Sequence, residues 1–266
     1  MGKQWLDLSD KVVIVTGGSM GIGEAMVEDL AGNGAKVVIA DYAKPSKTYD
    51  EKQVLYVPCD ITKKEEVENV VTKTMEAFGK IDGLVNNAGV TRPRVLVDYF
   101  EKEKKYELNE EDFDFMVNVN QKGTFLFAQA VTRVMYKQKS GVIINMSSEA
   151  GIQGSRAHSA YSGTKAAIHA YGLSWAKELG PYNIRVVGVE PAILDRTPAN
   201  NDEKYAAQAY GRGQDPNKFY GNYEKSIPLG RPGHLYEVAN LISYLVSDHA
   251  SYITGTTIAI TGGKSK

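Results

Sequence analysis

A tyrosine and a lysine four residues apart, with a serine upstream, are the residues of this sequence best suited to acid–base chemistry. In "YSGTK", Tyr161 and Lys165 would lie on one face of a helix, one turn apart. Free tyrosine has a pKa of about 10, too high for efficient proton transfer at neutral pH, but a neighbouring ammonium group favours the phenolate. Ser148, at the end of "GVIINMSS", can hydrogen-bond the same substrate oxygen. Taken alone, a Tyr–Lys pair at this spacing is more often a surface contact.

A glycine-rich turn, "TGGSMGIG" at residues 16–23, follows an apolar run and precedes a helical pattern. A strand, a tight turn and a helix start direct unpaired backbone N–H groups at one point, where a pyrophosphate can bind. A P-loop is excluded because Glu24 follows the last glycine, where lysine is required. Asp41 ends the next apolar run, where a carboxylate accepts hydrogen bonds from an adenosine ribose and repels a 2′-phosphate. We therefore expect NAD rather than NADP, with Lys44 and Lys47 moderating the repulsion.

Short β-branched runs alternate with amphipathic stretches along the chain. Such repeats predict a doubly wound parallel sheet of the Rossmann type with helices on both faces. No linker-like segment divides residues 1–266, so we expect a single domain. We predict strands at 11–15, 36–40, 54–57, 83–86, 141–147, 184–189 and 256–260, and helices at 21–31, 63–78, 110–138, 160–180 and 235–247.

Three connections depart from this alternation. Residues 41–54 are too few for a full crossover helix and contain Pro45, so we expect a loop there. Residues 91–112 form a long, charged connection, and long loops in compact domains are more often functional than incidental. The charged run within it is most simply a solvated surface. Residues 193–228, polar and rich in Tyr, Asn and Gly, are expected to vary with the substrate and to act as a mobile lid.

Composition excludes several classes of protein. The formal net charge is −1 with 24% charged residues, whereas nucleic-acid and membrane-surface binders are normally basic. Cys59 is the only cysteine, so no intramolecular disulfide can form, and we expect this residue in the core of a cytoplasmic protein. "MGKQWLDLSD" lacks the apolar segment of a signal peptide, and no apolar run is long enough to span a membrane. The four histidines lack zinc-like spacing, so no metal site is expected.

Together these motifs resemble the short-chain dehydrogenase/reductase family from about Asp10 to the end of the chain. "TGGSMGIG", "NNAG" at 86–89, "VNVNQKG" and the Ser and Tyr-x-x-x-Lys pattern occur in the family's order. The resemblance implies that Tyr161 exchanges the substrate proton while hydride passes to or from nicotinamide. It also implies that Lys165 holds the ribose and lowers the pKa of Tyr161, that Ser148 orients the substrate oxygen, and that Asn120 anchors a water linking Lys165 to solvent.

The resemblance also implies a set of cofactor-binding residues. Asp60, in "CDIT", stands where the family contacts adenine. Two departures are Ala192, where the family usually has glycine, and Thr197, one position later than a threonine that often contacts the carboxamide. The implied NAD-binding residues are Gly17, Ser19, Met20, Gly21, Ile22, Gly23, Asp41, Asp60, Ile61, Asn87, Ala88, Gly89, Tyr161, Lys165, Pro191 and Ile193.

Several stretches, some of them outside the shared motifs, resemble the branch of the family that acts on sorbitol 6-phosphate. These segments include "RPRVLVD", "GVIINMSSEAGIQGS" and "SYITGTTIAITGGK". The branch implies interconversion of sorbitol 6-phosphate and fructose 6-phosphate by a homotetramer, with 110–138 and 160–180 as contact helices. An NAD-dependent aldose or unphosphorylated polyol dehydrogenase is the alternative enzyme. A non-catalytic dinucleotide-binding regulator is disfavoured because Ser148, Tyr161 and Lys165 are all present.

A phosphorylated substrate requires cationic or hydrogen-bonding groups on the substrate side of the cleft. The leading candidates are Arg94, Arg156 and Arg196, and His158, three residues before Tyr161, is expected to line the cleft beside Ser148. Further basic candidates are Arg92, Arg212 and Lys218. Each of these side chains, considered alone, is also consistent with a solvated surface charge.

Overall fold

Seven parallel strands form one sheet, in the order β3-β2-β1-β4-β5-β6-β7, in the computed structural model. The structure describes residues 5–100, 102, 104–197, 202–215 and 223–264. All seven predicted strands and the Rossmann-type parallel sheet are confirmed. The strands are β1 Val12–Thr16, β2 Lys36–Asp41, β3 Val54–Pro58, β4 Gly83–Asn86, β5 Gly141–Met146, β6 Ile184–Pro191 and β7 Thr256–Ile260.

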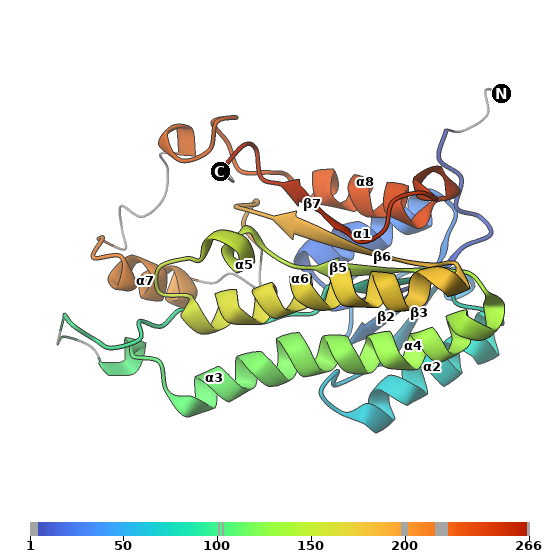
Figure 1. The fold of residues 1–266 in the computed structure, drawn as a ribbon, viewed down its shortest axis with the longest axis horizontal. Helices are drawn as coiled ribbons and strands as arrows, with labels where there is room; N and C mark the ends of the chain where they lie inside the picture. Colours follow the sequence, from blue (N-terminus) through green and yellow to red (C-terminus); the bar gives the residue numbers. More distant parts are fainter. Residues whose placement is uncertain (1–4, 101, 103, 198–201, 216–222, 265–266) are drawn as a thin grey trace.

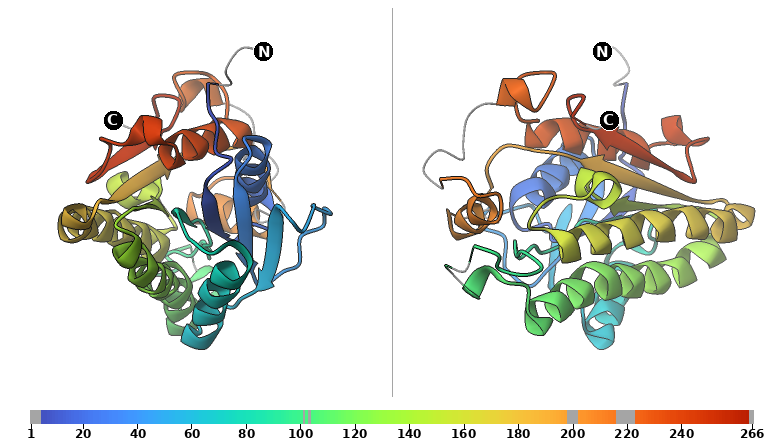
Figure 2. Two further views of the ribbon diagram at one scale, coloured as in Figure 1. Left: turned by 90° about the vertical axis from the view of Figure 1, so that its right-hand side faces the viewer. Right: turned by 60° about the vertical axis from the view of Figure 1, so that its left-hand side comes forward.

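Helices cover both faces of the sheet (Figures 1 and 2). On one face α1 (Gly21–Gly32) packs against α8 (Leu235–Val246). The other face carries α2 (Lys64–Phe78), α4 (Thr124–Gln138) and α6 (Ser159–Leu179). Because the central strands are covered on both faces, their residues are apolar on both sides, and every residue of β1 is buried. The result is two hydrophobic cores, one on each side of the sheet.

The structure confirms one predicted connection and refines two other predicted regions. No helix separates β2 from β3, as expected for residues 41–54. The predicted helix 110–138 is continuous but consists of α3 (Glu110–Met116), a π-helical segment (Val117–Gly123) and α4. Within 193–228, residues 202–211 form helix α7 (Asp202–Gly211), which the sequence did not predict. The remaining short helices of the described residues are α5 (Glu149–Gln153), η1 (Lys104–Tyr106), η3 (Gly180–Tyr182), η5 (Tyr223–Lys225) and η6 (Asp248–Ala250).

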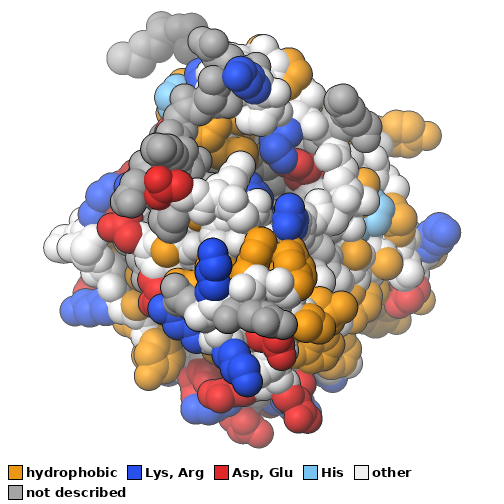
Figure 3. All heavy atoms as spheres, turned by 90° about the vertical axis from the view of Figure 1, so that its left-hand side faces the viewer, with side chains coloured by type: hydrophobic (Ala, Val, Ile, Leu, Met, Phe, Trp, Pro, Cys, Tyr) orange, Lys and Arg blue, Asp and Glu red, His pale blue; other side chains and the backbone are white. Residues whose placement is uncertain are grey.

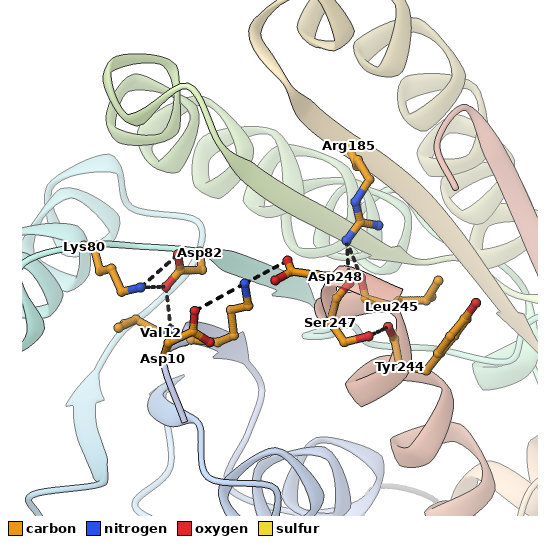
Figure 4. Close-up of polar contacts among 10 residues, drawn as sticks. Asp10, Val12, Lys80, Asp82, Arg185, Tyr244, Leu245, Ser247 and Asp248 are labelled. Atoms are coloured by element: carbon orange, nitrogen blue, oxygen red, sulfur yellow. Dashed lines mark hydrogen bonds and ion pairs between the residues drawn. The ribbon is translucent and has the colours of Figure 1, made fainter. Parts of the chain in front are cut away.

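The amino ends of the central strands are joined by polar contacts (Figure 4). Lys11 forms an ion pair with Asp248 at 2.9 Å, and Asp82 accepts a hydrogen bond from the first backbone N–H of β1 at 2.8 Å. Arg185 on β6 donates to the carbonyl oxygen of Leu245 at 2.6 Å, at the carboxyl end of α8. A guanidinium there satisfies a carbonyl that the helix leaves unpaired. Structural contacts therefore hold the amino ends of the strands together. The loops at the opposite, carboxyl ends of the strands form a cleft.

Candidate active site

A cleft of about 1310 Å³ lies at the carboxyl ends of the strands. Figure 3 views the molecule from this end and shows several Lys and Arg side chains around a central hollow. In a doubly wound sheet, ligands bind at this edge, where the strand order reverses. Among the predicted residues, the cleft is lined by Gly17, Met20, Gly21, Ile22, Gly23, Asp41, Asp60, Ile61, Asn87, Ala88, Gly89, Ser148, His158, Tyr161, Lys165, Pro191, Ile193 and Arg196.

The glycine turn after β1 is held in a shape that side chains would block. Gly17 has a φ of +65°, in the region that favours glycine. At Gly23, an added Cβ would lie 2.0 Å from the carbonyl oxygen of Gly17. Asn87, from the loop after β4, braces the turn by donating to the carbonyl oxygens of Thr16 and Gly17, each at 3.0 Å. The "NNAG" motif therefore supports the turn from the neighbouring strand.

The first turn of α1 provides a site for an anionic group. Its N-cap residue, Met20, makes no side-chain capping hydrogen bond. Gly21, Ile22 and Gly23 of this turn line the cleft. Backbone N–H groups and the positive end of the helix dipole favour a pyrophosphate there. The close backbone approach at Gly23 and the position of the helix end fit the diphosphate of a dinucleotide.

Asp41 connects the end of β2 to the glycine turn. Its carboxylate accepts from the backbone N–H of Ser19 at 2.9 Å and from that of Ala43 at 3.0 Å. Ser19 is buried and donates its hydroxyl to the carbonyl of Ala43, so it supports this corner without lining the cleft. Lys47 pairs with Glu24 and Glu28 of α1, which provides its ammonium group with carboxylate partners other than Asp41.

The loop after β3 forms the adjoining wall of the cleft. Asp60 accepts from the hydroxyl and the backbone N–H of Thr62, at 2.7 and 3.0 Å. Ile61 packs closely against Gly123, where an added Cβ would come within 2.5 Å of its Cδ1. An apolar side chain beside a fixed carboxylate suits the adenine ring predicted for this position. Cys59 is buried as expected, and burial raises the pKa of its thiol to about 12.

Ser148, Tyr161 and Lys165 lie together in the cleft. Burial raises the pKa of the Tyr161 phenol, and a hydrogen bond with Ser148 partly opposes that shift. Lys165 is 5% exposed; its Nζ donates to the carbonyl oxygen of Met146 at 2.6 Å and lies 5.8 Å from the centroid of the Tyr161 ring. Burial lowers the pKa of Lys165 to about 8. Ser148 and Tyr161 can therefore act on one substrate oxygen, with the amine of Lys165 close to the Tyr161 ring.

Asn120 lies behind these groups in the π-helical segment and is fully buried. Its amide accepts from the backbone N–H of Val90 at 2.8 Å and donates to the carbonyl oxygen of Val90 at 2.9 Å. It also donates to the hydroxyl of Thr164, the residue before Lys165, at 2.9 Å. Asn120 thus joins the loop after β4 to helix α6 without lining the cleft itself.

The basic residues predicted for a substrate phosphate occupy different places. Arg94 and Arg156 do not line the cleft. The Nε atom of Arg94 lies 2.8 Å from a carboxylate oxygen of Asp112, and Arg156 donates to the hydroxyl of Tyr99 at 2.8 Å. Arg196 lines the cleft, as does Arg212. Arg92 forms an ion pair with Asp112 at 3.7 Å, and Lys218 lies outside the described residues.

His158 lines the cleft as expected and packs edge-on against Tyr161. Its Nδ1 lies 3.1 Å from the carbonyl oxygen of Arg156, and burial lowers its pKa below the usual 6.5. The ring is therefore neutral at neutral pH. The described part of the chain contains no group of three or more His, Cys, Asp or Glu side chains able to hold a metal ion.

Sequence reasoning missed several cleft residues. Lys204, Tyr205 and Gln208 of α7 line the cleft, together with Phe115 of α3. The sequence did offer one indication of the α7 residues, because α7 lies within residues 193–228, the region expected to vary with the substrate. Thr16 was also missed as a support for the turn, although it is the first residue of the quoted glycine motif. Its hydroxyl accepts from the backbone N–H groups of Asn87 and Ala88, each at 3.0 Å.

The arrangement of fold, glycine turn and Ser–Tyr–Lys group is that of a dehydrogenase, and residues 11–207 match the short chain dehydrogenase family model. The chain belongs to this family. It is 46% identical over 263 residues to sorbitol-6-phosphate 2-dehydrogenase of Klebsiella pneumoniae, an alignment covering 98% of each chain.

Two solved structures are similar over nearly the whole chain. The crystal structure of levodione reductase matches with a TM-score of 0.85 and 30% identity, covering 97% of this chain and 98% of that one. The 3-ketoacyl-(acyl-carrier-protein) reductase of Brucella melitensis, complexed with NADH, matches with a TM-score of 0.80 and 29% identity, covering 96% and 98%. The chain is thus an oxidoreductase of a family that uses a nicotinamide dinucleotide. In the described residues no helix is sufficiently long and apolar to traverse a bilayer.

Proposed function

We propose that this chain is an NAD-dependent dehydrogenase that interconverts sorbitol 6-phosphate and fructose 6-phosphate. The observation that carries the reaction class is that Ser148, Tyr161 and the buried Lys165 line one cleft together with the glycine turn. The choice of substrate is supported by 46% identity to a sorbitol-6-phosphate 2-dehydrogenase over nearly the full length of both chains.

The cofactor would lie across the carboxyl edge of the sheet. The first turn of α1 would bind the diphosphate, Asp41 the adenosine ribose, and Asp60 with Ile61 the adenine. Pro191, the last residue of β6, and Ile193 would contact the nicotinamide. Asp41 supports NAD over NADP because its carboxylate, fixed by two backbone N–H groups, lies where a 2′-phosphate would add further negative charge.

In the proposed reaction, Tyr161 exchanges a proton with the reacting hydroxyl of the substrate. A bound nicotinamide cofactor supplies the hydride acceptor or donor. Ser148 holds the substrate oxygen, and its hydrogen bond to Tyr161 favours the phenolate. Lys165 in its protonated form stabilises the same phenolate and binds the ribose hydroxyls. A water anchored at Asn120 would return the proton to solvent, and the contacts of Asn120 keep α6 in register with the loop after β4.

The test is NAD reduction with sorbitol 6-phosphate, mannitol 1-phosphate, free sorbitol and glucose, measured side by side with purified protein. We expect the highest kcat/KM for sorbitol 6-phosphate and higher activity with NAD than with NADP. Equal or better kcat/KM for free sorbitol or glucose would instead identify an aldose or unphosphorylated polyol dehydrogenase.

The Tyr161→Phe variant tests the catalytic assignment separately. Loss of the hydroxyl should abolish turnover and leave NADH binding intact, because the glycine turn and Asp41 are unchanged. Turnover within about tenfold of the unmodified enzyme would refute the role of Tyr161, since general acid–base catalysis contributes about 10²- to 10⁴-fold. No turnover of any polyol by either protein would favour a non-catalytic dinucleotide-binding regulator.

We further propose that the enzyme is a cytoplasmic single-domain protein that assembles as a homotetramer through α3, α4 and α6. Phe113, Phe125 and Tyr136 on α3 and α4 are partly exposed, at 46%, 43% and 47%, which supports an apolar contact face there. Sedimentation at micromolar concentration tests the assembly, and a species of only 29.1 kDa would contradict it.

A further inference from the structure

The carboxyl end of α7 is packed against the loop that precedes the catalytic helix. At Gly211, the last residue of α7, an added Cβ would lie 2.3 Å from the Cβ of Ala157 and 3.3 Å from Cγ1 of Val95. Ala157 lies directly before His158, which contacts the Tyr161 ring. The backbone of Arg212 is therefore fixed close to the substrate side of the cleft, which its side chain helps to line.

The charged connection after β4 holds α7 in this position. Tyr210 donates its hydroxyl to Asp98 at 2.7 Å, and its ring packs against Tyr106 and Phe100 with centroid distances of 4.7 and 5.3 Å. Gln208, two residues before Tyr210 on α7, lies with its amide nitrogen 3.3 Å from Nε2 of His158. These contacts define the place from which the Arg212 side chain enters the cleft.

The surroundings of Arg212 suit an anionic ligand. Its guanidinium lies 3.5 Å from the hydroxyl of Ser155, and among the charges near it that of Glu149 attracts it and that of Arg156 repels it. Glu149 is buried and forms an ion pair with Lys264, so its negative charge is already compensated. Burial lowers the pKa of Arg212, which means that desolvation outweighs the attraction of its neighbours.

The other basic residues are less suitable. Arg196 lies at the rim, 59% exposed, 3.8 Å from Asp202 and over the ring of Tyr205. Lys204 is half-buried in the lining, where burial and Arg92 lower its pKa, but a lysine lacks the paired donors that match a phosphate. Arg212 combines partial burial, a fixed backbone and a guanidinium that can bind two phosphate oxygens at once.

We propose that Arg212 binds the phosphate group of the substrate and thereby selects phosphorylated over free polyols. This inference rests on the proposed function. The reacting carbon is oriented by Ser148 and Tyr161, and the phosphate at the other end of the carbon chain lies against the end of α7. Arg212 therefore determines specificity and takes no part in proton transfer.

The experiment compares the unmodified enzyme with Arg212→Met, Arg212→Lys, Arg156→Met and Lys73→Met, using NAD with sorbitol 6-phosphate and with free sorbitol. Arg212→Met should lower kcat/KM for sorbitol 6-phosphate about 10- to 100-fold, the usual effect of losing a hydrogen bond to a charged group, and change that for free sorbitol less than about threefold. Arg212→Lys should restore part of the loss by keeping the charge. Lys73 on α2 is an exposed control that removes one positive charge away from the cleft.

The outcomes separate this inference from the proposed function. If the unmodified enzyme shows no preference for sorbitol 6-phosphate, both fail. If it shows the preference and Arg212→Met retains it, or Arg156→Met abolishes it instead, the role of Arg212 is refuted and the function stands. An equal loss with both substrates would also overturn the inference, because Arg212 would then support α7 without recognising phosphate. Unchanged NADH affinity and circular dichroism verify that each variant is folded.

Discussion

Replacing Lys165 with methionine should abolish turnover but make the protein more stable at neutral pH. The side chain is buried, and burial lowers the pKa of its ammonium group from 10.5 to about 8. At pH 7 the folded protein therefore keeps a buried cation at a cost in free energy. A methionine fills the same space without a charge. The residue proposed to assist catalysis is thus one that the fold holds against a stability penalty.

The magnitude follows from the two pKa values. Their separation corresponds to about 3 kcal/mol of unfavourable free energy at low pH. Loss of the hydrogen bond to the Met146 carbonyl opposes the gain by about 1–3 kcal/mol, so the net stabilisation at pH 7 is small. The sign of the pH dependence is clearer. Because the folded-state pKa is the lower one, the penalty disappears as pH rises from about 8 to 10.5, and the unmodified protein gains stability relative to the variant.

The assay is urea unfolding of both proteins without cofactor, at equal concentration, at about pH 7 and about pH 9.5. The advantage of Lys165→Met should shrink by about 2 kcal/mol between the two conditions, whatever the effect of the lost hydrogen bond. Titration of Tyr161 should contribute little at the higher pH, because burial keeps its pKa above 10. Lys73→Met should show no such change. A difference independent of pH would mean that Lys165 is not held at a lowered pKa.

Three further changes have definite expected outcomes. Gly23→Ala should weaken NADH binding at least about tenfold in a fluorescence titration, because its Cβ would collide with the Gly17 carbonyl. Unchanged affinity would show that the glycine turn does not bind the diphosphate of the cofactor. Asp41→Asn should reduce the preference for NAD over NADP in kcat/KM while retaining an acceptor for one backbone N–H, and an unaltered ratio would contradict its role. Arg185→Met should lower the free energy of unfolding by about 1.5–3 kcal/mol with kcat unchanged, because it loses a bond to Leu245 at the edge away from the cleft. A loss of kcat at unchanged stability would contradict this purely structural role and show that Arg185 affects the active site at the opposite ends of the strands.

The sheet was predictable because each strand is a short run of β-branched residues bounded by turn signals. The loop at 41–54 was predictable from its length and from Pro45, which is poorly suited to a helix interior. The π-helical segment was not predictable, because local sequence does not reveal that Asn120 reaches the backbone of Val90. Helix α7 has weak apolar periodicity and is held by Tyr210 through contacts distant in sequence.

Contacts between residues distant in sequence also explain why the residues predicted to bind the substrate phosphate were only partly correct. Arg94 pairs with a carboxylate 18 positions later, and Arg156 binds a tyrosine 57 positions earlier. Sequence position placed both near the cleft, but long-range partners direct their side chains elsewhere. Arg212 was a lesser candidate because its relation to Ala157 depends on how α7 packs. The cofactor and catalytic groups were easier to place, since each directly follows a strand or lies on a helix with regular spacing.

The contact between Tyr210 and Asp98 has a consequence for how substrate range can change during evolution. The segment that carries Arg212 is attached through Tyr210 to Asp98 by a hydrogen bond and to Phe100 and Tyr106 by ring contacts. An insertion or exchange in either segment alone would leave the half-buried Tyr210 without these partners, and natural variation there should therefore occur jointly. Grafting a new specificity onto this scaffold would require the transfer of 91–109 and 202–214 as a pair, with the sheet and its glycine turn left untouched.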